Sequence, residues 1–244
     1  MTEDGDGRIA LVERLADAIA DEVARLDPTA SIGWDVLPDV RAMVLHVGGV
    51  QRWVTTVLRS GRGTRMPEPG EVDDLADWYR DGAEALLAAL REVPADTPCW
   101  VLGGPDRTAA FWRRRMVLEL GKHLADLRAA GGAPWRTVPE LRADDCADGV
   151  DELLEVFVPR ARTALPALPG AVELVADDLP RRWRIGADWS TGGGEDPAAR
   201  VHASAAELLL LLWERADPFD AARFRLEGDR AAVAALAAAR VHGW

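Results

Sequence analysis

Four long segments in the first 130 residues carry apolar side chains at every third or fourth position. In residues 8–26 these apolar positions are Ile9, Val12, Leu15, Ile19, Val23 and Leu26. Three further segments with helical spacing cover residues 36–60, 71–91 and 107–129. This spacing predicts amphipathic helices, each with an apolar stripe that has to be buried against a neighbour. Four such helices, joined by connections of mixed length, indicate a four-helix bundle.

The pattern changes after residue 130. Residues 131–145 have the composition of a linker, and a short helix is predicted at 148–163. The remaining segments are strand-like runs at 171–176, 181–187, 199–204 and 223–228 and predicted helices at 205–216 and 229–241. Short strands interleaved with helices indicate a small α+β domain. We therefore expect an α+β two-domain protein, with a helix bundle in residues 1–145 and an α+β domain in residues 146–244.

Charge and hydropathy exclude several classes of partner. The 244 residues carry a net charge of −12, which disfavours binding to nucleic acid and to anionic membranes. The most apolar run, residues 208–213, is far too short to span a bilayer. The N-terminal sequence MTEDGDGR is acidic and polar, unlike a secretory signal. We therefore expect a cytoplasmic protein with no nucleic-acid or membrane partner.

The two cysteines, Cys99 and Cys146, lie far apart and form no C-x-x-C pair. A structural disulfide is not expected in a reducing compartment. Either thiol remains an alternative nucleophile, although neither lies in a recognisable activating motif. The chain contains a single lysine, Lys122, and no asparagine, which indicates a GC-rich genome.

The most informative polar residues are Glu119 and His123, four residues apart in a predicted helix. Residues at this spacing lie on one helix face and can bind one divalent metal ion. His46, in another predicted helix, offers a third ligand. Three protein ligands of this type leave a coordination position open, as in catalytic zinc sites. The alternative is that His46 is a satisfied core histidine and that Glu119 and His123 form a surface pair.

Three consecutive arginines, Arg113–Arg115, precede Glu119. Arg115 is four residues before Glu119 and is expected on the same helix face. It is a candidate catalytic residue that clamps a substrate carboxylate, since guanidinium offers a bidentate fork. It could equally balance the charge of Glu119, and the cluster as a whole could be a solvated face.

Other aromatic and histidine residues receive weaker interpretations. Trp53 follows His46 by seven residues, about two turns, so it is expected to wall the same cavity. His202, on a predicted strand, and His242, near the C-terminus, are expected to be structural or exposed.

Several segments together resemble the mycothiol-dependent maleylpyruvate isomerase family, a branch of the DinB-like metal-binding helix bundles. The N-terminal blocks are Gly-Trp at 33–34, VLPDVRAMVLHVGGVQRW and AAFWRRRMVLELGKHLAD. The C-terminal blocks are ADGVDELL, HASAAELLLLLWER and LEGDRAAVAAL. The resemblance covers nearly the whole chain, with the blocks in the family's order and spacing.

The resemblance implies that His46, Glu119 and His123 bind a divalent metal, most simply Zn²⁺, and that water fills the remaining positions. It implies mycothiol, a small thiol of actinobacteria, as co-substrate, and the GC-rich composition fits that lineage. The other partner would be a small-molecule electrophile, and the protein would be a monomer. Family members commonly have His where this chain has Leu118, and Arg where it has Leu124; Asp126 is retained.

The reaction implied by the resemblance starts from the acidity of the thiol. A free thiol with a pKa near 8.5 is mostly protonated at neutral pH, and metal coordination deprotonates it. The thiolate would add to an unsaturated keto acid and leave after bond rotation, as in cis-trans isomerisation of maleylpyruvate. Alternatively it would stay attached to an electrophile, as in an S-transferase. The departures at Leu118 and Leu124 leave a further alternative open, a non-catalytic metal-binding protein that binds a ligand or partner.

Overall fold

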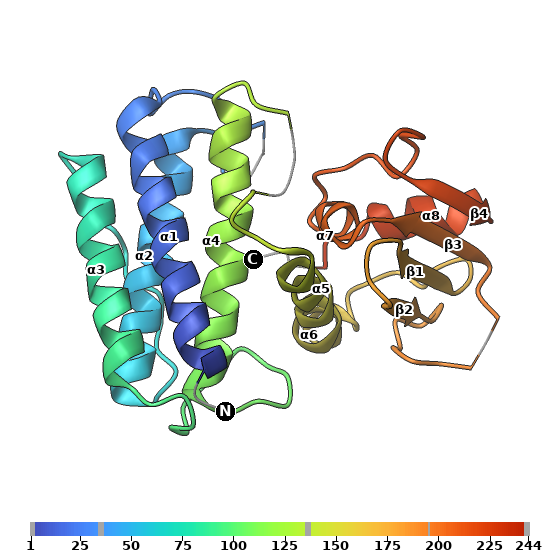
Figure 1. Cartoon of the computed structure of the whole chain (residues 1–244), viewed down its shortest axis with the longest axis horizontal. Coiled ribbons are helices and arrows are strands. Elements are labelled where there is room, and N and C mark those ends of the chain that lie inside the picture. The colour runs from blue at the N-terminus through green and yellow to red at the C-terminus, as the bar shows by residue number, and fades with distance from the viewer. Residues whose placement is uncertain (1–2, 34–36, 135–137, 195, 242–244) are drawn as a thin grey trace. The chain divides into compact units, whose positions relative to one another are not determined.

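The computed structural model describes residues 3–33, 37–134, 138–194 and 196–241. The chain divides into two compact units, Met1–Glu140 and Leu141–Trp244. Four packed helices form the first unit, and helices with a four-stranded mixed sheet form the second (Figure 1). The predicted fold class is therefore confirmed. Within these described ranges, no helix combines the length and apolar character needed to cross a membrane.

The helices of the first unit are α1 (Glu3–Arg25), α2 (Val40–Ser60), α3 (Leu75–Glu92) and α4 (Ala109–Ala130). The first residues of α2 and α3 are set by N-capping side chains rather than by where the apolar pattern begins. The Asp39 side chain accepts a hydrogen bond from the N–H of Ala42, and Asp74 accepts one from the N–H of Asp77. Such caps satisfy otherwise unpaired backbone donors. The predicted starts at 36 and 71 were therefore too early, and residue 36 itself lies outside the described residues.

The four helices form two parallel pairs. Helix α1 packs against α3 and α4, and α2 packs against the same two helices. Arg59 and Glu92 form an ion pair of 3.4 Å near the C-terminal ends of α2 and α3. Arg41, near the start of α2, donates a 3.0 Å hydrogen bond to the carbonyl of Val72, just before α3. Helices α2 and α3 are therefore parallel, and the connection 61–74 runs back along α2.

Helices α2 and α4 are antiparallel, and this decides where the predicted metal ligands meet. His46 of α2 lies opposite Glu119 of α4, with Nε2 of His46 at 3.2 Å from Oε1 of Glu119. Seven residues further along each helix, in opposite directions, Trp53 meets Trp112 with ring centroids 5.4 Å apart. The two contacts define one continuous register between the facing stripes of the helices.

In the second unit a continuous helical stretch consists of α5 (Ala143–Glu152), the π-helical segment η1 (Leu153–Phe157) and α6 (Val158–Ala161). The predicted linker at 131–145 therefore ends too late, because α5 begins at Ala143 rather than at residue 148. Asp145 accepts a hydrogen bond from the backbone N–H of Arg142 and so caps this start. Part of the predicted linker, residues 135–137, lies outside the described residues.

The sheet of the second unit has the strand order β2-β1-β3-β4. Its strands and remaining helices are β1 (Val172–Ala176), β2 (Arg182–Ile185), β3 (Ala199–Ala203), α7 (Ala205–Leu212), β4 (Arg225–Gly228) and α8 (Arg230–Ala237). Strand β1 pairs antiparallel with β2 and parallel with β3, while β3 and β4 are antiparallel. Alternate residues of β3 are buried, as expected for a sheet with one face against helices, and in β1 Glu173 is buried as well as Val172, Leu174 and Ala176. Helices α7 and α8 pack against these two strands.

Candidate metal centre

The three predicted ligands converge. His46 lies in the second turn of α2, after the Asp39 cap, and Glu119 and His123 lie one turn apart on α4. One ligand atom from each residue lies within 4.8 Å of the others. Among the described residues, no other three His, Cys, Asp or Glu side chains converge in this way. The sequence-predicted set is thus brought together from separate helices.

One carboxylate oxygen of Glu119 faces both imidazoles. Its Oε1 lies 3.2 Å from Nε2 of His46 and 3.2 Å from Nε2 of His123. The two imidazole rings meet edge to face, with centroids 5.2 Å apart. Two nitrogens and one oxygen therefore point at a common volume, which is the donor set that zinc prefers.

The other carboxylate oxygen of Glu119 is held by Arg115. The Arg115 guanidinium contacts Oε2 across one helical turn, and both side chains are almost completely buried. This arrangement orients the carboxylate so that Oε1 remains directed at the imidazoles. The contact shows Arg115 beside Glu119 rather than on a solvated face.

Asp126 orients the second histidine. Its Oδ2 lies 3.0 Å from Nδ1 of His123, and the carboxylate is fully buried. An ionised carboxylate can only accept a hydrogen bond, so Nδ1 carries the proton and Nε2 presents its lone pair. A carboxylate behind a ligand histidine is the usual way in which proteins fix the orientation of that ligand.

The hydrogen bonding of His123 fits a metal ligand. Its Nε2 is buried and makes no hydrogen bond of acceptable geometry with any described residue, although Glu119 is close by. A buried polar atom without a partner is costly in a folded protein. A divalent metal bound between Nε2 of His123, Nε2 of His46 and Oε1 of Glu119 would satisfy it. The residues present therefore fit a metal ion.

The electrostatics of the site favour the protonation states that a metal requires. Burial lowers the pKa of His46, although the Glu119 carboxylate opposes this effect. Burial opposes ionisation of Glu119, but Arg115 and the two histidines hold its pKa well below the usual range. At neutral pH the site thus offers a neutral imidazole and an ionised carboxylate, as metal ligation needs.

Access to the site differs between the ligands. The His46 side chain is 16% exposed, whereas those of Glu119 and His123 are 1% and 2% exposed. His46 is therefore the most exposed of the three ligands.

The structure separates the remaining sequence candidates. Arg113 is buried and donates hydrogen bonds of 3.0 Å to the carbonyls of Leu90 and Val93, at the C-terminal end of α3. It therefore caps α3. Trp53 packs against Trp112, two turns from His46 along α2, and its place in the wall of the metal cavity stays a prediction.

The cysteines and His202 show no comparable arrangement. Cys99 and Cys146 are buried and are not joined by a disulfide. Burial raises the pKa of the Cys99 thiol, the opposite of nucleophile activation. His202 is half-buried on β3, between Asp177 and Glu227 at 3.7 and 3.6 Å. His242 lies outside the described residues, as does Trp34 of the Gly-Trp turn.

Sequence reasoning missed the orienting role of Asp126 and the burial of Lys122. Asp126 follows His123 by three residues, so their shared helix face was a signal that could have been used. Lys122 is 7% exposed, and its charge contributes to lowering the pKa of His46. Lys122 is the single lysine of the chain, but no sequence pattern indicated that it would be buried near the site.

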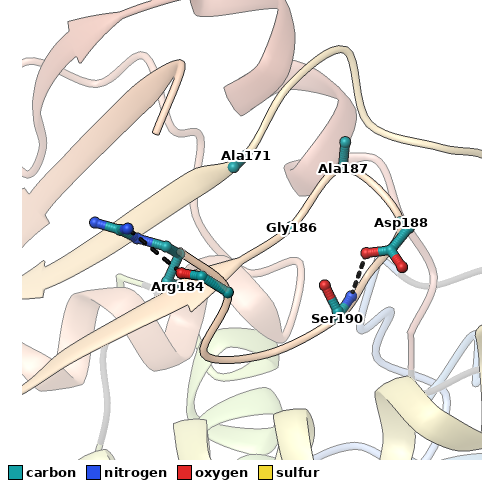
Figure 2. Close-up of a pocket in the computed structure, with 7 residues that line it drawn as sticks. Ala171, Arg184, Gly186, Ala187, Asp188 and Ser190 are labelled. Carbon is teal, nitrogen blue, oxygen red and sulfur yellow. Dashed lines mark hydrogen bonds between the residues drawn. The ribbon is translucent and has the colours of Figure 1, made fainter. Parts of the chain in front are cut away.

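A cavity of about 350 Å³ lies in the second unit, beside the β2 hairpin (Figure 2). Its two charged side chains, Asp188 and Arg184, are already paired. Ser190 donates its backbone N–H to Asp188 at 3.0 Å, and Arg184 donates to Glu173 at 3.0 Å and to the Gly193 carbonyl at 3.4 Å. The converging, incompletely satisfied ligands of the first unit are therefore the better candidate for chemistry.

Comparison with known proteins agrees with this architecture. Residues 9–128 match the family model "Mycothiol maleylpyruvate isomerase N-terminal domain", and residues 144–235 match "MDMPI C-terminal domain". No curated protein matches the chain.

Two solved structures share the fold. The chain is similar to the crystal structure of a histidine-to-alanine mutant of the mycothiol-dependent maleylpyruvate isomerase, with a TM-score of 0.66, 14% identity, and coverage of 91% of this chain and 92% of that chain. It is also similar to the crystal structure of the mycothiol-dependent maleylpyruvate isomerase, with a TM-score of 0.62, 15% identity, and coverage of 87% and 90%. With matches to both domain models covering most of its length, the chain belongs to the mycothiol-dependent maleylpyruvate isomerase family.

Proposed function

We propose that this protein is a zinc-dependent enzyme that uses a small thiol, mycothiol, on a small-molecule electrophile. The reaction is either cis-trans isomerisation of the maleylpyruvate type or transfer of the thiol to the electrophile. The observation that carries the proposal is the convergence of His46, Glu119 and His123 on one volume, with a buried Nε2 of His123 left without a hydrogen bond.

The side chains around the ligands divide the work of holding a metal ion. His46, Glu119 and His123 supply the donor atoms, and all three come from rigid helices. Arg115 holds the second oxygen of Glu119, and Asp126 holds Nδ1 of His123. When bound, a divalent metal keeps a coordinated thiol deprotonated at neutral pH, which provides the nucleophile for either reaction.

A thiol would approach a bound metal from the side of His46, because the other two ligands are enclosed. Burial of the remaining ligands excludes water from most of the site and strengthens each charge interaction inside it. Three protein ligands rather than four leave room for thiol and substrate, as in catalytic zinc centres.

A substitution of His46 tests the proposal, with His202 as the matched control. Both histidines are half-buried, but His202 lies on β3 of the other unit. We expect the natural protein and His202→Ala to contain about one zinc per chain and to consume maleylpyruvate or a test electrophile only with mycothiol. His46→Ala should lose both properties. Unchanged zinc content and unchanged thiol-dependent turnover in His46→Ala would remove the proposal.

A second candidate is a metal-binding protein without catalysis, which the two leucine substitutions favour. Leu118 and Leu124 are 2% and 0% exposed, so apolar core residues stand where family members commonly place His and Arg. Thermal unfolding with zinc and with mycothiol separates the candidates. Stabilisation by zinc alone, with no further shift on adding mycothiol, would favour binding without thiol chemistry.

A further inference from the structure

Among the described residues, the large apolar side chains that are exposed to solvent are Met66 and Trp100, at 45% and 38%. They lie on different connections of the helix bundle, yet these connections are joined. The backbone N–H of Trp100 donates a 3.0 Å hydrogen bond to the carbonyl of Gly61. Gly63 lies directly against the Trp100 ring, since a Cβ there would approach Cδ2 to 2.8 Å. The two exposed residues thus belong to one local surface.

This surface follows α2 toward the metal ligands. Trp53 of α2 donates its Nε1–H to the carbonyl of Thr64 at 2.8 Å. One turn closer to His46, Met66 covers Gly49, because a Cβ on Gly49 would lie 3.6 Å from the Met66 sulfur. Gly49 is three residues from His46, so the two are neighbours on the helix surface. Trp100, Met66 and the partly exposed ligand His46 therefore follow one another along α2, with the buried Trp53 between the first two, and we call this series the apolar strip.

The dimensions of the strip suit an extended ligand. His46 and Trp53 are seven residues apart, which corresponds to about 10 Å along the helix axis. The strip leads to His46, the most exposed of the three ligands. Methionine and tryptophan together offer an adaptable and polarizable apolar contact.

We propose that Met66 and Trp100 form a subsite for an extended apolar group, alkyl or aromatic, of the electrophile. This inference rests on the proposed function and deepens it. A small dicarboxylate held at the metal has no apolar part that would cover the strip. The subsite therefore favours a larger apolar electrophile and, with it, thiol transfer over isomerisation of a small keto acid.

Straight-chain hydroxamic acids test the subsite, because the hydroxamate head binds zinc and the tail length can be varied. Calorimetry on the zinc-loaded full chain should show affinity that rises about two- to fourfold for each methylene added between acetohydroxamic and octanohydroxamic acid, up to the fourfold that complete burial would give. Met66→Ser should weaken octanohydroxamate binding at least about fivefold and leave acetohydroxamate binding unchanged. Glu68→Gln, an exposed change on the same connection, should alter neither. Equal affinity along the series, or equal tail dependence in Met66→Ser, would overturn the subsite.

The same experiment separates failure of the subsite from failure of the proposed function. Zinc and acetohydroxamate binding without tail dependence would refute the subsite alone. If the protein takes up no zinc, the proposed function fails, and methionine-methyl NMR of the metal-free chain with octanoate then decides the subsite. The Met66 signal, assigned by its loss in Met66→Ser, should shift while those of the buried Met43 and Met116 stay in place. An unshifted Met66 signal would refute the subsite without reference to metal.

Discussion

Replacing Arg115 by methionine tests whether this guanidinium balances Glu119 or instead serves as a substrate clamp. The side chains of Arg115 and Glu119 are 8% and 1% exposed, so solvent screens their interaction weakly. Methionine keeps much of the side-chain length and removes the charge. The Glu119 carboxylate would then be buried without its cation, close to two imidazoles that do not replace a permanent positive charge.

The structure gives a magnitude for this change. Removing one partner of a buried ion pair costs about 3–5 kcal/mol, because the other charge is left unpaired. For a domain of this size each kcal/mol lowers the melting temperature by about 2–4 °C. We therefore expect the metal-free Arg115→Met protein to melt on the order of 10 °C below the natural protein. The pKa of Glu119 should rise, because the guanidinium is the strongest influence that opposes burial of the carboxylate.

Urea unfolding in the presence of a chelator measures the effect, and a double-mutant cycle isolates it. Glu119→Gln removes the charge that Arg115 balances, so Arg115→Met should cost far less in that background. A coupling energy above about 2 kcal/mol supports charge balance. If Arg115→Met differs from the natural metal-free protein by less than about 1 kcal/mol, the balancing role is refuted. Loss of turnover without loss of stability would then point to a substrate clamp.

Three further predictions follow from the contacts of single residues. Asp126→Asn should weaken zinc binding about 10- to 100-fold, measured against a competing chelator, since a neutral amide replaces the charged acceptor that orients His123. Gly48→Ala should destabilise the protein by about 1–3 kcal/mol, because its Cβ would lie 2.2 Å from the Trp78 ring. Gly49→Ala is the matched control and should be neutral or stabilising by up to about 1 kcal/mol. Equal urea midpoints for the Gly48→Ala and Gly49→Ala proteins would contradict the close packing of Gly48 on Trp78. Burial opposes ionisation of Glu173, but two arginine hydrogen bonds hold its pKa below the usual range. The ionised Glu173 therefore stabilises the protein above its unfolded-state pKa near 4.3, and this stabilisation is lost as the pH falls through its lower folded-state pKa. In Glu173→Gln the difference between the unfolding free energies at pH 6 and at pH 3 should be smaller than in the natural protein.

Apolar periodicity predicted each bundle helix but located some ends poorly. Helix α1 begins at Glu3, five residues before the predicted start, because residues 3–7 (EDGDG) contain no apolar residue that could extend the pattern. Helix α5 begins at Ala143 for a related reason, since its first turn is acidic and gives no apolar signal. In both places the backbone continues as a helix beyond the stripe that faces the core.

The candidate site was predictable in its ligand types but not in its supporting contacts. The sequence placed Arg115 on the face of Glu119, and the structure shows the two in contact. It did not indicate that Arg113, two residues earlier, would turn to the end of α3. Such differences arise because neighbouring residues on a helix point in different directions and meet different elements.

The sequence alone determined that Glu119 and His123 share one helix face, because helical geometry is local and follows from a spacing of four residues. The arrival of His46, from a different helix, at 3.2 Å from Glu119 was decided by the tertiary structure. The long connection 61–74 makes α2 parallel to α3 and therefore antiparallel to α4, whose start lies at the end of α3. In the resulting register Trp53 packs on Trp112 and His46 lies level with its partners. Burial of the carboxylate and the orienting contacts of Arg115 and Asp126 likewise depend on how the helices pack, which no local pattern specifies.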